Sequence, residues 1–418
     1  MHKEHAGDPP PSPFSPVRLG PLTLRNRFIK SGANEGMTPT GLPTQALLKH
    51  HRDLAAGGIG MTTVAYAAVA PDGLTFSHQM HMHAGIVPHL RALTDAVHRE
   101  GAAACLQLTH AGSFTMMRHG GSRAPGSAST GLNAFGLLYG VYFQRAMSEV
   151  DMVRVAAEFA QAAQLARESG FDAVEIHMGH GYLLNQFLSP LSNRRHDGFG
   201  GSVEQRSRFP VHVLNQVKDA VGAQLAVTCK LSVSDGAPGG NTAQDSAVTA
   251  RLLEAAGADL LTLSGGRNVE SPWVLFGSPM PTTAMKAAAP HAFARFGVKM
   301  LEMRTPRNLR FREHYFLEDS RTIRAAVNMP LAYVGGVLSI DGVGQLMAEG
   351  FDCVALARAL IHDPALVTHF RDGTVTRSAC NSCNGCVARI YDPAGVSCTL
   401  GPANDPALTQ QLAASQSS

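Results

Sequence analysis

The stretch EIHMGHGYLLNQFLSP, residues 175–190, decides how this chain is interpreted. Residues 172–176 form an apolar run that is typical of a buried strand. Directly after it come His177, His180 and Tyr182. Two neutral imidazoles can donate hydrogen bonds to one substrate oxygen, and a nearby phenol can deliver a proton to carbon. Each residue taken singly is more often a packed side chain, but the three together predict a catalytic turn.

The same change from an apolar run to a polar end recurs along the chain. The expected strands are 28–33, 59–64, 103–109, 172–177, 225–231, 258–264, 331–335 and 353–357. Helical spacing marks 44–56, 87–100, 150–169, 203–221, 246–256, 318–326 and 340–348. Several strands are apolar on both faces, as parallel strands covered by helices should be. Eight such units predict an α/β fold, a (β/α)8 TIM barrel, with a doubly wound open sheet as the alternative.

Local signals support the helix boundaries and mark two irregular segments. Ser148 with Asp151 predicts an N-terminal cap for the third helix. Gly170 and Gly257 stand where a helix must hand over to the next strand. Residues 113–147 and 272–316 carry few regular signals. We expect the first to be a loop excursion over the active face and the second to hold an insertion that shapes the substrate site.

Composition limits the classes of partner. The chain has 418 residues, 44% of them hydrophobic, and its 35 basic and 32 acidic residues give a net charge of +3. This near balance gives no reason to expect nucleic acid or an anionic membrane surface as a partner. No apolar run reaches the length of a membrane span. We therefore expect a small-molecule substrate, no nucleic acid and no membrane, and a homo-oligomer stays open.

Four segments are expected along the chain. Residues 1–15 hold charges and prolines without an apolar core, which indicates a flexible tail and not a secretory signal. Residues 16–370 form the barrel, residues 371–405 a cysteine-rich extension packing on it, and residues 406–418 a second flexible tail. The odd number of cysteines, seven, indicates a reducing, cytoplasmic location.

The strand ends carry groups that suit a flavin, because active groups of such barrels gather at the C-terminal ends of the strands. Ser31, Gly32 and Ala33 are small enough for a flat ring to lie against the backbone. Gln107 offers a donor and an acceptor to the mixed edge of a flavin pyrimidine. Lys230 places a cation where it would stabilise an anionic reduced ring.

The last two strands end in residues that suit a phosphate. Gly335 and Gly336 follow the seventh strand, and Ala357 and Arg358 follow the eighth. Glycine amides and an arginine at this place in a barrel predict a phosphate cradle.

Residues 177–199, with Asn193-Arg-Arg195 after the proline, resemble the signature of the Old Yellow Enzyme family of NADH:flavin oxidoreductases. The resemblance covers about residues 16–402 and is nearest to the 2,4-dienoyl-CoA reductase branch. It implies FMN as cofactor and NADH or NADPH as reductant. It also implies that His177 and His180 hold a substrate oxygen and that Tyr182 gives the proton.

The resemblance also assigns the cofactor positions residue by residue. The positions implied to bind FMN are Gln107, Lys230, Gly336 and Arg358, with Ser31, Gly32, Ala33, Gly335 and Ala357 lining it through backbone. Three positions depart from the family pattern. Ala357 replaces the usual glycine, Asn34 stands where a Thr or Cys tunes the flavin potential, and Tyr66 stands where a small residue approaches the flavin.

Four cysteines near the end form a second candidate site. Cys380, Cys383, Cys386 and Cys398 have a spacing that suits a 4Fe–4S cluster or one tetrahedral zinc. The dienoyl-CoA reductase branch holds a 4Fe–4S cluster on a similar set, with three residues between its second and third cysteines where this chain has two. That branch reduces its cluster through an FAD/NADPH domain, and no fingerprint of such a domain follows here. Cluster, zinc and free thiols all stay open.

The expected reaction is transfer of a hydride from NAD(P)H through FMN to the activated C=C bond of an α,β-unsaturated carbonyl or dienoyl substrate. Two alternatives remain. One is an FMN-dependent dehydrogenase or demethylase of the same family that oxidises amines. The other is a non-redox barrel lyase that uses Lys230 as a Schiff-base nucleophile.

Overall fold

The computed structural model describes residues 9–118, 124–289, 292–392 and 394–401. Eight parallel strands close into a barrel in the order β10-β11-β12-β13-β3-β4-β5-β9. Their bounds are β3 Phe28–Lys30, β4 Met61–Ala68, β5 Ala103–Thr109, β9 Ala173–Met178, β10 Ala226–Ser232, β11 Leu260–Ser264, β12 Leu331–Tyr333 and β13 Cys353–Leu356. The predicted TIM barrel is confirmed, and the open-sheet alternative is wrong because the first strand, β3, pairs with the last, β13.

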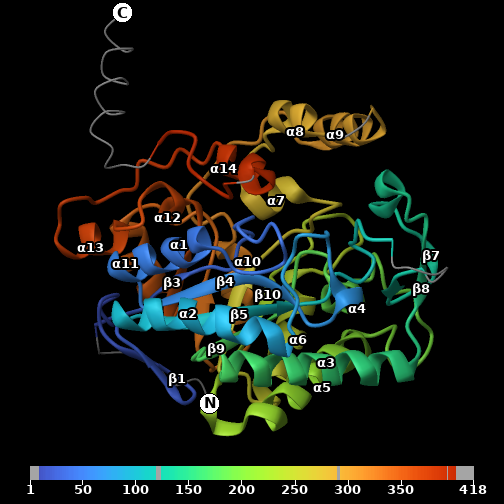
Figure 1. The fold of residues 1–418 in the computed structure, drawn as a ribbon, viewed down its shortest axis with the longest axis horizontal. Coiled ribbons are helices and arrows are strands. Elements are labelled where there is room, and N and C mark those ends of the chain that lie inside the picture. Colours follow the sequence, from blue (N-terminus) through green and yellow to red (C-terminus); the bar gives the residue numbers. More distant parts are fainter. Residues whose placement is uncertain (1–8, 119–123, 290–291, 393, 402–418) are drawn as a thin grey trace, which may run out of the picture.

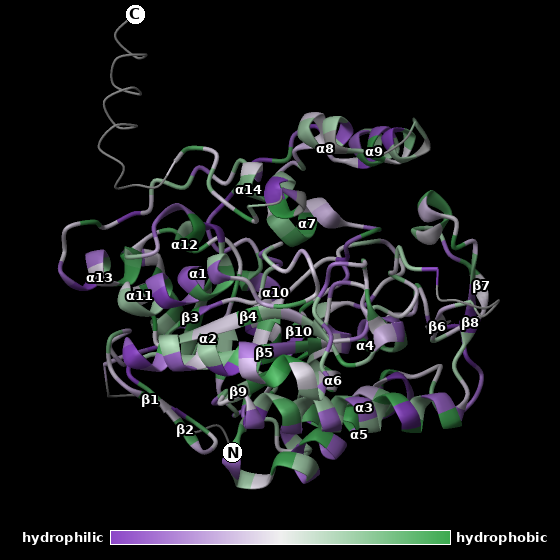
Figure 2. Ribbon diagram, in the orientation of Figure 1, coloured by the Kyte–Doolittle hydropathy of each residue, from purple (hydrophilic) through white to green (hydrophobic). Residues whose placement is uncertain are grey.

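Helices cover the outside of the barrel, as Figure 1 shows. The helices that follow successive strands are α1 Gln45–Ala56, α2 Val87–Arg99, α3 Glu149–Glu168, α5 Val203–Val221, α6 Ala243–Ala255, α10 Leu317–Arg324, α11 Ile340–Ala348, and α12 Arg358–His362 with α13 Leu366–Arg371. On α3 and α5 hydrophobic and hydrophilic residues alternate along the ribbon (Figure 2). This pattern fits helices that bury one face on the strands and expose the other to solvent.

The cap at Ser148 and the two glycine positions predicted at helix ends are confirmed. The Ser148 hydroxyl accepts from the Asp151 backbone N–H while the Asp151 carboxylate accepts from the Ser148 backbone N–H, a reciprocal capping box. Gly170 and Gly257 have φ angles of +83° and +80°, in the left-handed region that favours glycine. At both places the glycine therefore ends the helix and allows the chain to turn into the next strand.

The interior of the barrel is filled by small and medium side chains. Ala173, Ala226 and Ala332 point inward with Cys105 and Cys353, and all are fully buried. A hairpin of β1 Val17–Leu19 and β2 Leu22–Leu24 packs into the same cluster. In Figure 1 this hairpin lies at the lower left of the molecule, while α8 and α9 lie at its top. The hairpin thus closes one end of the barrel, and the candidate site residues lie at the other end.

The two irregular segments contain more regular structure than the sequence indicates. The excursion holds three short strands, β6 Gly126–Ser127, β7 Gly131–Leu132 and β8 Phe143–Ala146, which form one sheet. The insertion holds α7 Pro272–Phe276, α8 Thr282–Ala288 and α9 Ala292–Arg304. Two more short helices, α4 Leu183–Leu188 and α14 Gly385–Ala388, complete the set. The short elements carry too few residues for a periodic signal, whereas α9, with 13 residues, is as long as α2 and was not predicted.

The ends of the chain are only partly described. Within the expected N-terminal tail, Phe14 packs on Phe28 with ring centroids 5.4 Å apart. Residues 1–8 and 402–418, including the expected C-terminal tail at 406–418, lie outside the described residues. Among the helices that are described, none combines the length and apolarity needed to cross a membrane.

A matched pair of glycine variants tests the packing of the barrel. A Cβ at Gly60 would lie 2.6 Å from the backbone oxygen of Asn26, whereas a Cβ at Gly344, inside α11, would meet nothing within 4 Å. We expect Gly60→Ala to lower the free energy of unfolding by about 1–3 kcal/mol through overpacking. Gly344→Ala should raise it by about 0.5–1 kcal/mol through helix propensity. Urea unfolding measures both, and equal midpoints would contradict the close approach at Gly60.

Candidate active site

The structure brings the three predicted catalytic residues together at the C-terminal end of β9. His177, His180 and Tyr182 are all buried. Nε2 of His177 lies 3.3 Å from Nδ1 of His180. The His177 ring centroid is 4.9 Å from that of His180 and 4.6 Å from that of Tyr182. Two imidazoles and a phenol therefore share one small volume.

The backbone of this turn is held in an uncommon conformation. His180 has a φ angle of +60°, and Gly181 follows at +87°. The Gly181 N–H donates to Oδ1 of Asn185, at 2.9 Å, and the Asn268 N–H donates to the His180 carbonyl, at 3.1 Å. Tyr182 then caps α4. These bonds fix a left-handed residue that would otherwise be disfavoured.

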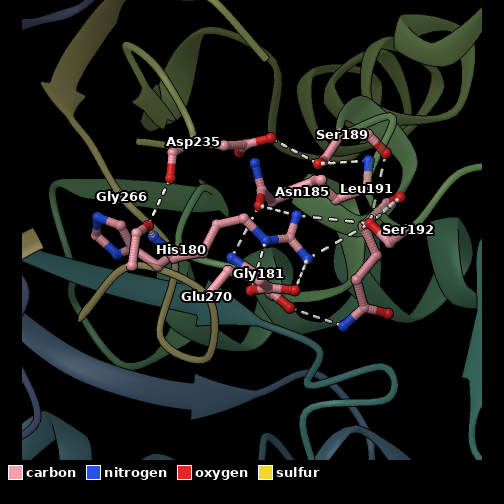
Figure 3. Close-up of polar contacts among 12 residues, drawn as sticks. His180, Gly181, Asn185, Ser189, Leu191, Ser192, Asp235, Gly266 and Glu270 are labelled. Carbon is pink, nitrogen blue, oxygen red and sulfur yellow. Dashed lines mark hydrogen bonds and ion pairs between the residues drawn. The ribbon is translucent and has the colours of Figure 1, made fainter. Parts of the chain in front are cut away.

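A buried arginine supports the turn from the next loop. Arg267 lies after β11 and donates to Oδ1 of Asn185, at 3.0 Å, and to the carboxylate of Glu270, at 2.9 Å. Asn185, Ser192 and Glu270 converge on one set of polar contacts in Figure 3. The same Asn185 oxygen also accepts from the Gly181 N–H, so Arg267 acts on the turn through the Asn185 side chain.

Both histidines of the turn are neutral at neutral pH. Burial, the neighbouring His180 and the Lys230 cation hold the pKa of His177 well below its usual value. Burial and Lys230 lower the pKa of His180 to about 3. Neutral rings can each donate one hydrogen bond and accept one. The pair can therefore polarise an oxygen without transferring a full proton to it.

The predicted ring-binding residues meet around a carboxylate. In the parallel register Gln107 pairs with Glu175 across β5 and β9, and Lys230 pairs with His177 across β9 and β10. Nε2 of Gln107 donates to Oε1 of Glu175 at 2.7 Å, and Nζ of Lys230 lies 3.3 Å from the same oxygen. Glu175 was not predicted as a site residue. The sequence feature that could have indicated it is an acidic residue inside an otherwise apolar strand.

Lys230 joins this cluster to the end of β3. Its Nζ donates to Oγ of Ser31 and to the carbonyl of Gly32, each at 3.0 Å. Together with Glu175, these acceptors use the three N–H groups of an ammonium. A Schiff-base nucleophile needs a free amine, so this environment favours a cationic role for Lys230 over the lyase alternative.

The surface beside these groups suits a flat ring. A Cβ at Gly32 would lie 2.6 Å from Nε2 of Gln107, so only glycine leaves that approach open. Ala33 follows and is partly buried. The cofactor residues predicted from the first, third and fifth barrel strands are thus neighbours, and their donors and acceptors fit the edge of a flavin.

Tyr66, which stands where the family pattern has a small residue beside the flavin, lies beside Tyr182. The two ring centroids are 5.4 Å apart, and Phe76 and Phe114 complete an aromatic cluster at 6.1 Å from Tyr66 and 5.4 Å from Tyr182. Burial raises the pKa of Tyr66, although hydrogen bonds with Thr75 and Tyr182 oppose that rise. The Tyr182 phenol therefore has a second phenol as its neighbour.

The predicted phosphate residues lie against the insertion. Arg358 begins α12, and Ala357 is its N-terminal cap. The Arg358 guanidinium donates to Oγ of Ser278 at 3.1 Å, to Oδ1 of Asn384 at 2.6 Å and to the Phe276 carbonyl at 2.8 Å. The cation is thus held by the residues after α7 and by the cysteine-rich segment.

The glycine pair lies next to the same wall. Gly335 and Gly336 lie at the start of the connection from β12 to α11, and Gly336 has a φ angle of +75°. A Cβ at Gly336 would lie 2.8 Å from the Tyr315 ring and 2.9 Å from the Phe311 ring. Phe311 also lies 5.9 Å from the Arg358 guanidinium. Gly336 and the Arg358 guanidinium thus lie against the same aromatic wall, and their role in binding a phosphate stays a prediction.

A buried ion pair behind the site was not predicted. Lys30 pairs with Glu35 and donates to the Thr63 carbonyl at 2.9 Å. The other carboxylate oxygen of Glu35 accepts from the Ala65 N–H at 3.2 Å. The pair therefore ties the end of β3 to the residue before Tyr66. A lysine inside an apolar strand was the signal available in the sequence.

The cysteine cluster finds no geometric support as a metal site. Among the residues that the structure describes, no group of three or more His, Cys, Asp and Glu side chains is arranged to hold a metal ion. Burial raises the pKa of Cys386 to about 11, and Cys398 has the His362 ring 3.4 Å away. A thiol with a raised pKa is a poor ligand until a metal displaces its proton. A metal at these four cysteines stays a prediction.

Comparison with known proteins gives a consistent result. Residues 12–273 match the NADH:flavin oxidoreductase / NADH oxidase family. The 4,4'-dithiodibutanoate disulfide reductase of Rhodococcus erythropolis is 40% identical over 388 residues, which cover 92% of this chain and 94% of that protein. The NADH oxidase of Thermoanaerobacter brockii is 29% identical over 94% of this chain, but the match spans only 56% of its own length. The chain therefore matches the first relative end to end and about half of the second.

Solved structures share the barrel. A 2-naphthoyl-CoA reductase complex superposes with a TM-score of 0.76 at 21% identity, over 94% of this chain and 57% of that one. Morphinone reductase superposes with a TM-score of 0.66 at 22% identity, over 89% of this chain and 92% of its own. At these identities the likeness establishes the fold.

The lowered pKa of His180 predicts how stability depends on pH. The unfolded chain protonates this ring near pH 6.5, whereas the folded chain does so only near pH 3, so the free energy of unfolding falls as the pH drops below 6.5. Asparagine tolerates a positive φ. Between pH 7 and pH 5, the free energy of unfolding of His180→Asn should therefore fall by about 2 kcal/mol less than that of the unmodified protein. Urea unfolding at both pH values measures this. His89→Asn, at an exposed site on α2, is the control, and identical pH slopes in all three proteins would contradict the assignment.

Proposed function

The chain belongs to the NADH:flavin oxidoreductase / NADH oxidase family, as an FMN-dependent NAD(P)H oxidoreductase, and we propose that it is an ene-reductase. In this proposal it reduces the activated C=C bond of a small α,β-unsaturated carbonyl compound with electrons from NADH or NADPH. One observation carries the proposal: two neutral imidazoles with facing nitrogens 3.3 Å apart lie beside a buried tyrosine, on the strand that neighbours Gln107 and Lys230.

The residues that would hold FMN fall into two groups. Those at the ring are Ser31, Gly32, Ala33, Tyr66, Gln107 and Lys230, and those at the phosphate are Gly335, Gly336, Ala357 and Arg358. When bound, FMN supplies the hydride and is restored by NAD(P)H. Lys230 keeps a positive charge beside the ring edge, and Glu175 holds Gln107 in one orientation by accepting its amide N–H at 2.7 Å.

His177 and His180 bind the carbonyl oxygen of the substrate. Negative charge grows on that oxygen when hydride reaches the β-carbon, and preorganised donors stabilise such charge most strongly in a buried site. Because both pKa values are lowered, the rings are neutral throughout the neutral pH range. A neutral imidazole N–H donates a hydrogen bond without transferring its proton.

Tyr182 supplies the proton that completes the reaction. Hydride adds to the β-carbon, the electrons of the C=C bond move to the α-carbon, and the Tyr182 O–H protonates that carbon. Tyr182 recovers its proton from solvent through its neighbours. The sum is one alkene, one NAD(P)H and one proton giving one saturated carbonyl compound and one NAD(P)+.

A second acceptor is supported by a specific comparison. The relative that matches this chain end to end is a disulfide reductase, whereas the NADH oxidase is matched over only about half its length. The corresponding reaction takes one disulfide, one NAD(P)H and one proton to two thiols and one NAD(P)+. Its products are thiols, so no carbon is protonated and Tyr182 is less critical.

Removal of the histidine pair tests the oxygen site. We expect His177→Ala/His180→Gly, in which glycine tolerates the φ angle of +60°, to abolish the charge-transfer absorbance of the FMN-loaded protein with phenols. Turnover of 2-cyclohexenone should fall by about two to three orders of magnitude. Absorbance titration and stopped-flow reduction measure these effects. Unchanged phenol binding and enone turnover in the double variant would overturn the proposal.

Removal of the phenol separates the two acceptors. Tyr182→Phe should slow enone reduction by about 10²–10⁴-fold, because the α-carbon loses its acid. Reduction of the flavin by NADH or NADPH should change little. If 4,4'-dithiodibutanoate is instead the preferred acceptor, it will be turned over faster than any enone and will be affected far less by Tyr182→Phe. Oxidation of a methylamine with an artificial acceptor, without enone or disulfide turnover, would contradict both.

A further inference from the structure

The two imidazoles belong to one directed chain of hydrogen bonds. The Gly179 N–H donates to Nδ1 of His177 at 3.2 Å, so this neutral ring carries its proton on Nε2. That N–H points at Nδ1 of His180, 3.3 Å away, which therefore accepts. His180 in turn carries its proton on Nε2 and donates it to Oγ of Ser264 at 2.8 Å.

This arrangement does not yet suit a substrate oxygen. Such an oxygen must accept from both facing nitrogens, Nε2 of His177 and Nδ1 of His180. His177 already carries its proton on the facing nitrogen, whereas His180 carries it on the far side. Because a neutral imidazole has one N–H, His180 can donate to the ligand only if Nε2 becomes an acceptor.

We infer that Ser264 is a positioning residue that sets the tautomer of His180. Its hydroxyl accepts from the Nε2–H when no ligand is bound. When the ring carries its one proton on Nδ1 instead and donates that N–H to a substrate oxygen, the Ser264 hydroxyl donates to Nε2. A hydroxyl is suited to this task because it rotates between donor and acceptor roles. Among the described residues Ser264 is the only hydrogen-bond partner of Nε2. The inference rests on the proposed oxygen site of the two histidines.

His180 is held both at its backbone and at both ring nitrogens, so in this inference its proton moves and its ring stays. The backbone N–H of His180 donates to Oγ of Ser232 at 3.1 Å, and its carbonyl accepts from the Asn268 N–H. The ring contacts His177 through Nδ1 and Ser264 through Nε2. Figure 3 shows His180 beside Gly266, on the loop that follows Ser264 in the sequence. Ser264 is buried at the end of β11. A buried Nε2 acceptor without a donor would cost free energy.

The experiment compares Ser264→Ala with Ser264→Thr, which keeps the hydroxyl, in the FMN-loaded protein. Titration with 4-hydroxybenzaldehyde gives the dissociation constant from the charge-transfer band. We expect Ser264→Ala to weaken binding about threefold to tenfold, the effect of one hydrogen bond, and Ser264→Thr to stay near the unmodified protein. Ser232→Ala removes a hydroxyl that accepts from the His180 backbone N–H and donates to the Gly266 carbonyl, and it should leave the tautomer exchange in place because the ring keeps its bond to Ser264.

Nitrogen-15 NMR of histidine-labelled protein reads the tautomer directly, with His180 assigned from its loss in His180→Asn. We expect the proton on Nε2 without ligand and on Nδ1 with 4-hydroxybenzaldehyde. Ser264→Ala should retain a mixture in the bound state. A His180 tautomer that does not change, or equal affinity in Ser264→Ala, would overturn the role of Ser264. Failure of the oxygen site itself would be seen separately, as full phenol binding in His177→Ala/His180→Gly.

Discussion

The buried carboxylate of Glu175 is the interaction on which the rest of the site depends. It accepts from Gln107 at 2.7 Å and lies 3.3 Å from Nζ of Lys230. Without it, two polar side chains from neighbouring strands would be buried without this shared acceptor, one of them a cation, and an uncompensated buried charge is strongly destabilising. With it, the ends of three parallel strands present one amide and one cation in fixed positions.

The same cation shapes the chemistry of the turn beyond β9. Lys230 lies beside His177 in the strand register, and its charge adds to burial in keeping both imidazoles neutral. A protonated pair would bind an anion as a salt bridge in the ground state. A neutral pair gains most when charge develops on a bound oxygen, which is the condition for catalysis and not only for binding.

Much of the site could be predicted because it follows directly from strand ends. In a closed parallel barrel all such ends meet at one mouth, so Gln107, Lys230, His177 and Tyr182 could be grouped from their places in the sequence alone. The second layer could not be predicted in this way. Glu175 and Arg267 act through partners distant in sequence, and the pair of Lys30 and Glu35 acts on Thr63 and Ala65, about 30 residues away. A charged residue within an apolar run does not indicate which residue it will contact.

The sequence by itself determined the barrel and its caps and marked the turn that carries the three candidate catalytic residues, since alternating runs, capping residues and glycines act locally. Only the tertiary structure decided that the end of α7 and the cysteine-rich segment meet at Arg358, and that the hydroxyl of Ser264 meets the ring of His180. Which nitrogen of a neutral imidazole carries the proton is set by the groups around it. Those groups come from different strands and meet only when the barrel closes.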